Sequence, residues 1–151
     1  MDVDGVLTDG KIILGNGNIE LKAFNVRDGL AISLASKNGL KTAFITSRIS
    51  EAVTRRGKEL KVDYLRQGAT NKLDELNKIV AHAKITLDEV CYIGDDLIDI
   101  ELLKVVGFSA TVVDAPKEVK SCVSFVSNKQ GGEGAVREII ELILKTRGNW
   151  Q

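Results

Sequence analysis

The chain alternates short apolar runs with stretches in which apolar residues recur every three or four positions. The short runs are rich in β-branched and aromatic residues and predict strands, whereas the longer periodic stretches predict amphipathic helices. The predicted strands are 40–48 (LKTAFITSR), 62–68 (VDYLRQG), 90–96 (VCYIGDD), 108–113 (FSATVV) and 124–127 (SFVS). The predicted helices lie at about 28–38, 50–60, 71–83, 97–105, 116–121 and 136–145. This alternation is typical of an α/β fold with a mostly parallel sheet flanked by helices.

One segment breaks the alternation and predicts a β-hairpin. KIILGNGNIELKAF (11–24) contains two β-type runs around Gly15-Asn16-Gly17-Asn18, which is a strong hairpin signal. We expect the hairpin to stand over the carboxyl edge of the sheet, where open α/β folds bind ligands. The sequence has no other insertion long enough for a cap domain, so residues 1–151 are predicted to form a single domain. A lone copy could not easily bury the apolar residues of the hairpin, Ile12, Ile13, Leu14, Ile19, Leu21 and Phe24.

Composition narrows the classes of function. The formal net charge is zero, which does not favour a nucleic-acid or anionic-membrane partner. No apolar stretch approaches the ~20 residues that span a bilayer, and no signal peptide precedes the first acids, so we expect a cytoplasmic protein. His82 is the only histidine, which excludes a histidine-based triad or a multi-histidine metal site. Cys91 and Cys122 lack neighbours at metal-ligand spacing and are interpreted as small buried hydrophobic residues.

The opening MDVDGVLTDG places Asp2 where a strand is expected to end, with only Met1 ahead of it. A buried central strand usually has several more residues. We therefore expect apolar residues upstream of Met1 that this sequence does not contain.

Polar side chains follow three of the predicted strands, and a lysine begins one of the predicted helices. These residues are Asp2 and Asp4, Thr46 and Ser47, Asp95, Asp96 and Asp99, and Lys72 of ATNKLDEL. The carboxyl ends of parallel strands meet at one crevice, so these side chains are expected to converge. Three or more carboxylates together raise one another's pKa unless a cation neutralises them. An all-oxygen set of this kind suits Mg²⁺, and with a lysine and a hydroxyl it indicates phosphoryl transfer.

Each of these features has a plainer interpretation. DVDG could begin a calcium loop, but Val6 and Leu7 stand where that loop needs an acid or amide and a glycine, so we reject this interpretation. GDDLID could be a solvated helix start, because acids there favour the helix dipole. Lys72 taken alone is more often a surface lysine, and Thr46 could satisfy a backbone group at a strand end. The ordered combination at successive strand ends favours one site.

The same residues resemble a known family. DVDG, ITSR, the lysine of NKLDE and GDDLID are similar to the four motifs of the haloacid dehalogenase superfamily of phosphotransferases. DVDGVLTDG, FNVRDG, YIGDDLID and GGEGAVRE resemble 3-deoxy-D-manno-octulosonate 8-phosphate phosphatases, which lack a cap domain, and the resemblance covers nearly the whole chain. It implies a Rossmann-like haloacid dehalogenase fold and Mg²⁺-dependent hydrolysis of an eight-carbon sugar-acid phosphate.

The resemblance also implies roles for individual residues. Asp2 would attack phosphorus and form an aspartyl-phosphate, and Asp4 would act as general acid and then general base. Mg²⁺ would be held by the Asp2 carboxylate, the Asp4 backbone carbonyl and Asp95. Thr46 would hydrogen-bond a phosphate oxygen, while Lys72 would balance charge on the nucleophile and the phosphoryl group.

Further residues are implied by the same resemblance. Asp99 and Asp96 would orient Lys72 or a metal-bound water. The family's sugar-binding loop matches Asn25, Val26, Arg27, Asp28 and Gly29, and basic positions near its entrance match Arg48 and Arg56. Arginines suit a sugar acid because they bind carboxylates and phosphates in bidentate geometry. Arg137 either closes a neighbouring subunit's site or caps its own helix.

The family is typically a homotetramer in which one subunit's hairpin covers the next subunit's crevice. Two departures from the family are Ser47, where many relatives have glycine, and Glu133, where some have a basic residue. Two alternatives stay open. One is a phosphatase for a nine-carbon, sialic-acid-like 9-phosphate. The other is a non-catalytic oligomerisation partner of a sugar-nucleotide synthetase.

Overall fold

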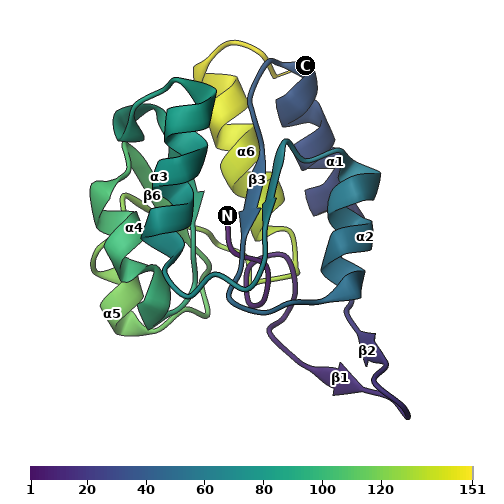
Figure 1. The fold of residues 1–151 in the computed structure, drawn as a ribbon. Helices are drawn as coiled ribbons and strands as arrows, with labels where there is room; N and C mark the ends of the chain where they lie inside the picture. Colours follow the sequence, from purple (N-terminus) through teal and green to yellow (C-terminus); the bar gives the residue numbers. More distant parts are fainter. Residues whose placement is uncertain (151) are drawn as a thin grey trace.

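The computed structural model describes residues 1–150 (Figure 1). The strands are β1 (Ile13–Leu14), β2 (Glu20–Leu21), β3 (Ala43–Ile45), β4 (Tyr64–Arg66), β5 (Cys91–Ile93), β6 (Phe108–Thr111) and β7 (Phe125–Val126). The α-helices are α1 (Val26–Lys37), α2 (Glu51–Leu60), α3 (Lys72–Ala83), α4 (Ile100–Val105), α5 (Lys117–Lys120) and α6 (Ala135–Thr146). Two 3₁₀ turns, η1 (Leu87–Glu89) and η2 (Leu97–Asp99), flank β5. Strand–helix alternation is therefore confirmed.

The first two residues join two sets of parallel strands. β3 pairs with β4, and β5, β6 and β7 pair in that order, all in parallel. Met1 donates its amine to the Ala43 carbonyl at 3.0 Å and accepts from the Ile45 amide at 3.0 Å. The Asp2 amide donates to the Ile93 carbonyl at 2.9 Å. Met1 and Asp2 thus lie between β3 and β5, at the centre of the strand order, which places Asp2 at the carboxyl edge.

Side chains alternate between two cores on opposite faces of these strands. Phe44 and Ile93 pack with residues 2–8 (DVDGVLT, the motif loop), α1 and α6, whereas their neighbours Ile45 and Tyr92 pack with α3 and α4. This is the two-residue period of a strand buried on both faces. Cys91 and Cys122 are free thiols packed against different cores, and both are half-buried, not fully buried as the interpretation of small buried hydrophobic residues expects.

The main differences from the sequence-based elements lie at their ends. Predicted strand 40–48 is regular only at Ala43–Ile45, since the carboxyl end of that run leaves the sheet for the site. Helix α1 begins at Val26, two residues earlier than predicted, because the Asn25 side chain accepts the Arg27 amide at 2.8 Å and caps the helix. Predicted helix 97–105 starts as a 3₁₀ turn, in which Asp96 and Asp99 form a capping box.

The predicted hairpin is present and projects from the body of the protein (Figure 1). Its antiparallel register pairs Ile13 with Leu21 and Leu14 with Glu20. Gly17 and Asn18 at its tip have positive φ angles of 64° and 53°, the conformation that tight hairpin turns require. Leu14 is 74% exposed and Leu21 is 56% exposed, so the hairpin carries its apolar side chains outside the core. Among residues 1–150, no helix combines the length and apolar character needed to cross a membrane.

Candidate active site

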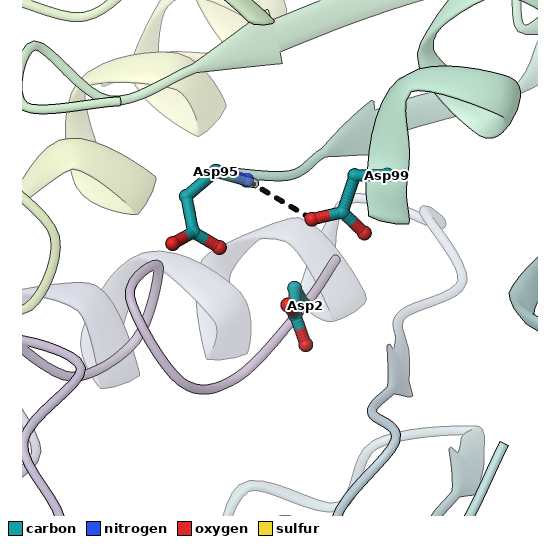
Figure 2. Close-up of side chains that lie close together, drawn as sticks. All are labelled: Asp2, Asp95 and Asp99. Carbon is teal, nitrogen blue, oxygen red and sulfur yellow. Dashed lines mark hydrogen bonds between the residues drawn. The ribbon is translucent and has the colours of Figure 1, made fainter. Parts of the chain in front are cut away.

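Acids from distant parts of the sequence meet at the carboxyl edge of the strands. Figure 2 shows Asp2, directly after Met1, beside Asp95, which follows β5, and Asp99, which ends η2. One carboxylate oxygen from each of the three lies within 4.8 Å of the others. The convergence expected from the parallel strands is therefore present in the structure.

Lys72 points into this cluster from the first residue of α3. Its Nζ lies 2.8 Å from Asp2 Oδ2 and 2.8 Å from Asp99 Oδ1, and its side chain is only 3% exposed. Burial by itself would lower the pKa of Lys72, but Asp2 and Asp99 outweigh it, so the pKa stands above its usual value. The plainer interpretation of Lys72 as a surface lysine is wrong.

Asp99 is completely occupied by donors. Its Oδ1 accepts from Lys72 and from the Tyr92 hydroxyl at 2.7 Å, and its Oδ2 accepts from the Asp95 and Asp96 amides at 3.1 and 3.3 Å. A carboxylate has about four lone-pair sites, so these four donors leave none for a cation. The geometry makes Asp99 a residue that fixes Lys72 and the turn carrying Asp95, although its oxygens lie near the other two acids.

Asp95, unlike Asp99, has a carboxylate oxygen that is buried and accepts no hydrogen bond. Within residues 1–150, Oδ1 has no hydrogen-bond partner. Burial, followed by the charges of Asp2 and Asp99, raises the pKa of Asp95 to about 7. The carboxylate lies against the motif loop at Gly5, whose φ is +88° and where an added Cβ would stand 1.9 Å from Asp95 Oδ2. The absence of a side chain at Gly5 therefore leaves space for the carboxylate of Asp95, the candidate metal ligand.

Charge balance in this cluster fits a divalent cation. Asp2, Asp95 and Asp99, when ionised, face the single ammonium of Lys72, which leaves two negative charges. Burial and then Asp99 raise the pKa of Asp2 despite its hydrogen bonds from Lys72 and the Val3 amide. A hard cation held by oxygen ligands would remove both the excess charge and the unpartnered oxygen of Asp95.

Asp4 lies in the same loop but has different partners. Lys22 of the hairpin donates to Asp4 Oδ1, and Arg48 Nε stands 3.9 Å from Asp4 Oδ2. Glu20 accepts from Arg48 Nη2 at 2.6 Å. No sequence motif pointed to Glu20 or Lys22 as functional residues. Glu20 and Lys22 are two residues apart, so both charges lie on one face of the second strand of the hairpin. This spacing is the sequence signal that could have identified them.

Thr46 directly follows β3 (Ala43–Ile45). It is 3% exposed, and its Oγ1 accepts the Arg48 amide at 3.4 Å. Its own amide and carbonyl bond Arg66 and Ala69, so the strand end is fixed by backbone contacts. The neighbouring Ser47 and the capping Asp96 are both exposed.

Among the described residues, no hydrogen bond or ion pair joins the predicted sugar-binding loop to the acid cluster. Asn25 caps α1 and donates to the Gly132 carbonyl at 3.2 Å, whereas Val26 is 79% exposed and Arg27 is also exposed. Asp28 of this loop is buried against the start of helix α6. It is 1% exposed, and its Oδ1 accepts the Arg137 amide at 2.8 Å and so caps that helix, whereas its Oδ2 has no hydrogen-bond partner among the described residues.

Gly29 and Arg56 are packed together behind this loop. A Cβ on Gly29 would stand 2.3 Å from Arg56 Nη2, so the glycine provides space for the guanidinium. Arg56 Nη1 bonds Glu59 at 2.9 Å, and the guanidinium lies 5.6 Å from the centre of the Phe24 ring. Arg137 pairs with Glu141 on its own helix at 3.2 Å.

A cavity of about 510 Å³ lies away from the acids, on the amino side of the strands. Leu40, Val90, Phe108 and Ile143 are among its mainly apolar lining residues. Ligand sites are commonly apolar cavities. Here the charged groups are at the opposite edge, so the chemistry of the side chains identifies the site.

Known proteins of similar sequence are hydrolases of the family that the sequence motifs resemble. A family model described as haloacid dehalogenase-like hydrolase matches residues 65–140. The 3-deoxy-D-manno-octulosonate 8-phosphate phosphatase KdsC of Escherichia coli strain K12 is 42% identical over 148 residues, which cover 98% of this chain and 79% of that protein. The Yersinia pestis phosphatase of the same name is 41% identical over 143 residues, or 95% of this chain and 76% of that protein.

Solved structures agree over the whole fold. The Moraxella catarrhalis 3-deoxy-D-manno-octulosonate 8-phosphate phosphatase, in complex with magnesium ion, phosphate ion and KDO, superposes with a TM-score of 0.96 at 40% identity, covering 99% of this chain and 86% of that one. The cobalt-bound Haemophilus influenzae phosphatase gives a TM-score of 0.93 at 36% identity, covering 97% and 86%. The chain therefore belongs to the haloacid dehalogenase-like hydrolases and, among them, to the 3-deoxy-D-manno-octulosonate 8-phosphate phosphatases.

Proposed function

We propose that this chain hydrolyses 3-deoxy-D-manno-octulosonate 8-phosphate to the free sugar acid and phosphate, with Mg²⁺ as cofactor. The observation that carries the proposal is the cluster of Asp2, Asp95 and Asp99 around the buried Lys72, with two uncompensated negative charges and an unpartnered Asp95 oxygen. The relatives named above support the substrate, and the Moraxella catarrhalis complex supports the metal.

In this proposal Mg²⁺ is held by the Asp2 carboxylate, the Asp4 backbone carbonyl and Asp95, and it supplies charge neutralisation at the phosphoryl oxygens. A carboxylate oxygen of Asp2 attacks phosphorus while the bond from phosphorus to the sugar oxygen breaks. Asp4 gives its proton to the leaving oxygen. It then takes a proton from the water that attacks the aspartyl-phosphate, which releases phosphate and restores Asp2.

The remaining residues hold the reacting groups in place. Lys72 fixes Asp2 Oδ2 at 2.8 Å and balances charge as the phosphoryl group arrives. Asp99 holds Lys72 and the backbone beside Asp95, whereas the exposed Asp96 serves as the cap of that turn. Thr46, buried at the end of β3, is assigned a hydrogen bond to a phosphate oxygen.

Substrate contacts are proposed for Arg48 beside Asp4 and, in a second copy, for the loop carrying Asn25, Val26 and Arg27. Because no hydrogen bond or ion pair joins this loop to the acid cluster among the described residues, we assign its sugar-binding role to a neighbouring subunit's site. The exposed apolar hairpin supports that arrangement, which we propose to be a homotetramer. Gly29 and Arg56 would shape the base of the loop. The single domain and the cytoplasmic location stay predictions.

The test is phosphate release from the eight-carbon and nine-carbon sugar-acid phosphates, each with Mg²⁺ and with a chelator. We expect Mg²⁺-dependent turnover with a higher kcat/KM for the eight-carbon substrate. Equal or reversed preference would assign the nine-carbon substrate instead. Asp2→Asn should abolish release. If that variant matched the wild-type protein, the non-catalytic oligomerisation role would replace the phosphatase.

A further inference from the structure

The hairpin contributes two charged residues to the neighbourhood of Asp4. Lys22, just beyond β2, donates to Asp4 Oδ1, and its side chain is 0% exposed. Glu20 lies 3.3 Å from Lys22 Nζ through Oε1 and 2.6 Å from Arg48 Nη2 through Oε2. Arg48 in turn approaches Asp4 Oδ2 at 3.9 Å. The four side chains form a closed ring of alternating charge that ties the hairpin to the motif loop.

The ring treats the two oxygens of Asp4 differently. Oδ1 accepts the Lys22 ammonium, whereas Oδ2 is buried and has no hydrogen-bond partner in the described part of the chain. An ammonium has donors only, and the carbonyl oxygen of a protonated carboxyl is a better acceptor than its hydroxyl oxygen. Contact of Oδ1 with Lys22 therefore favours a proton on Oδ2. Lys22 thus favours Oδ2 as the oxygen of Asp4 that gives and takes a proton.

Glu20 keeps Lys22 in this position. Burial of a lysine ammonium is costly unless anions surround it, and Asp4 and Glu20 both supply negative charge. Arg48, then further hydrogen bonds including that of Lys22, lower the pKa of Glu20 to about 2. The Glu20 carboxylate therefore stays ionised at neutral pH and holds both cations at the edge of the site.

We propose that Lys22 is a positioning residue that fixes Asp4 through Oδ1, so that Oδ2 is the proton-transferring oxygen, and that Glu20 aligns Lys22 for this purpose. The inference rests on the proposed function, in which Asp4 protonates the leaving group. It gives the hairpin a role in the chemistry of its own subunit, beyond any contact with a neighbouring one.

The test compares two leaving groups with Lys22→Met, Lys22→Arg and Glu20→Gln. A sugar phosphate has a poor alkoxide leaving group that needs the proton from Asp4, whereas p-nitrophenyl phosphate has a good one that does not. The ratio kcat/KM reports steps up to departure of the leaving group, so it isolates the acid role from later hydrolysis of the aspartyl-phosphate. Lys11→Met is the matched control, because Lys11 pairs with Asp9 at 2.8 Å on the exposed side of the same hairpin.

We expect Lys22→Met to lower kcat/KM for the sugar phosphate on the order of 100-fold and for p-nitrophenyl phosphate less than about 10-fold. Lys22→Arg should restore much of the loss, Glu20→Gln should show a smaller loss with the same selectivity, and Lys11→Met should match the wild-type protein. Equal losses on both substrates, or none, would overturn the inference. If the wild-type protein hydrolyses other alkyl phosphates but neither sugar acid, the proposed substrate fails while the same comparison on an alkyl phosphate still tests Lys22.

Discussion

Asp99 accepts a hydrogen bond from Lys72 at 2.8 Å in a buried ion pair, with Asp99 0% and Lys72 3% exposed. The same carboxylate receives the Tyr92 hydroxyl and the amides of Asp95 and Asp96. One acid therefore organises the lysine, the loop after β5 and, through Lys72, the position of Asp2. The consequences of this arrangement can be measured.

Asp99→Ala should lower the free energy of unfolding by about 3–5 kcal/mol, because it leaves the Lys72 ammonium buried with only Asp2 as counter-charge. Two amides and a hydroxyl would also lose their acceptor. Urea denaturation followed by circular dichroism measures this change. Asp74→Asn, an exposed acid in the first turn of the helix that carries Lys72, is the matched control and should unfold near the wild-type midpoint. Comparable stability of Asp99→Ala would contradict the buried network.

Gly5→Ala should disrupt metal binding without removing a charged group. The new Cβ would stand 1.9 Å from Asp95 Oδ2, so the carboxylate must move. We expect the Mg²⁺ concentration for half-maximal phosphate release to rise about 10-fold or more. Gly17→Ala is the control for backbone strain, because its φ is also positive, at +64°, but an added Cβ meets nothing within 4 Å. If both variants change the half-maximal Mg²⁺ concentration equally, backbone strain and not contact with Asp95 explains why residue 5 is a glycine.

Asp95 should make stability depend on pH in opposite ways with and without Mg²⁺. Its pKa is raised from 3.8 to about 7 by burial, Asp2 and Asp99, so the folded chain binds more protons than the unfolded chain between these values. Without metal, this group's contribution is fully present below about pH 4 and is lost as pH rises through about 7. Mg²⁺ binds the ionised carboxylate, so its stabilising effect should grow over the same upper range.

Thermal unfolding from about pH 5 to about pH 8, in a chelator and in Mg²⁺, measures this behaviour. Asp95→Asn should reduce the decline in unfolding temperature with pH in the chelator. It should also reduce the increase in unfolding temperature that Mg²⁺ produces. A gain from Mg²⁺ that stays constant across the range would show that protonation of Asp95 does not control metal binding.

Asp28→Ala should affect stability and not substrate binding. The carboxylate caps helix α6 through the Arg137 amide, so its loss should cost about 1–2 kcal/mol. Asp28→Asn keeps an oxygen acceptor and should retain most of that stability. The KM for the sugar-acid phosphate should stay at the wild-type value in Asp28→Asn. A large rise in KM would instead support Asp28 as a substrate contact.

Local patterns in the sequence determined most of the fold and the centre of the site. Two-residue alternation at Phe44 and Ile45 identifies a strand buried on both faces, and glycine and asparagine at the hairpin tip identify the turn. Asp2, Asp95 and Lys72 could be grouped in advance, because parallel strands bring their carboxyl ends to one edge wherever the helices lie.

Tertiary structure alone decided which neighbours these residues have. Nothing local distinguishes Asp28, buried under the first turn of α6, from an acid facing a ligand, since its partner amide is 109 residues away. Lys22 meets Asp4 only because the projecting hairpin returns across the motif loop. Periodicity reports which face of an element is buried. The charge that a buried side chain meets depends on how distant elements pack, and that information is not carried by any single stretch of sequence.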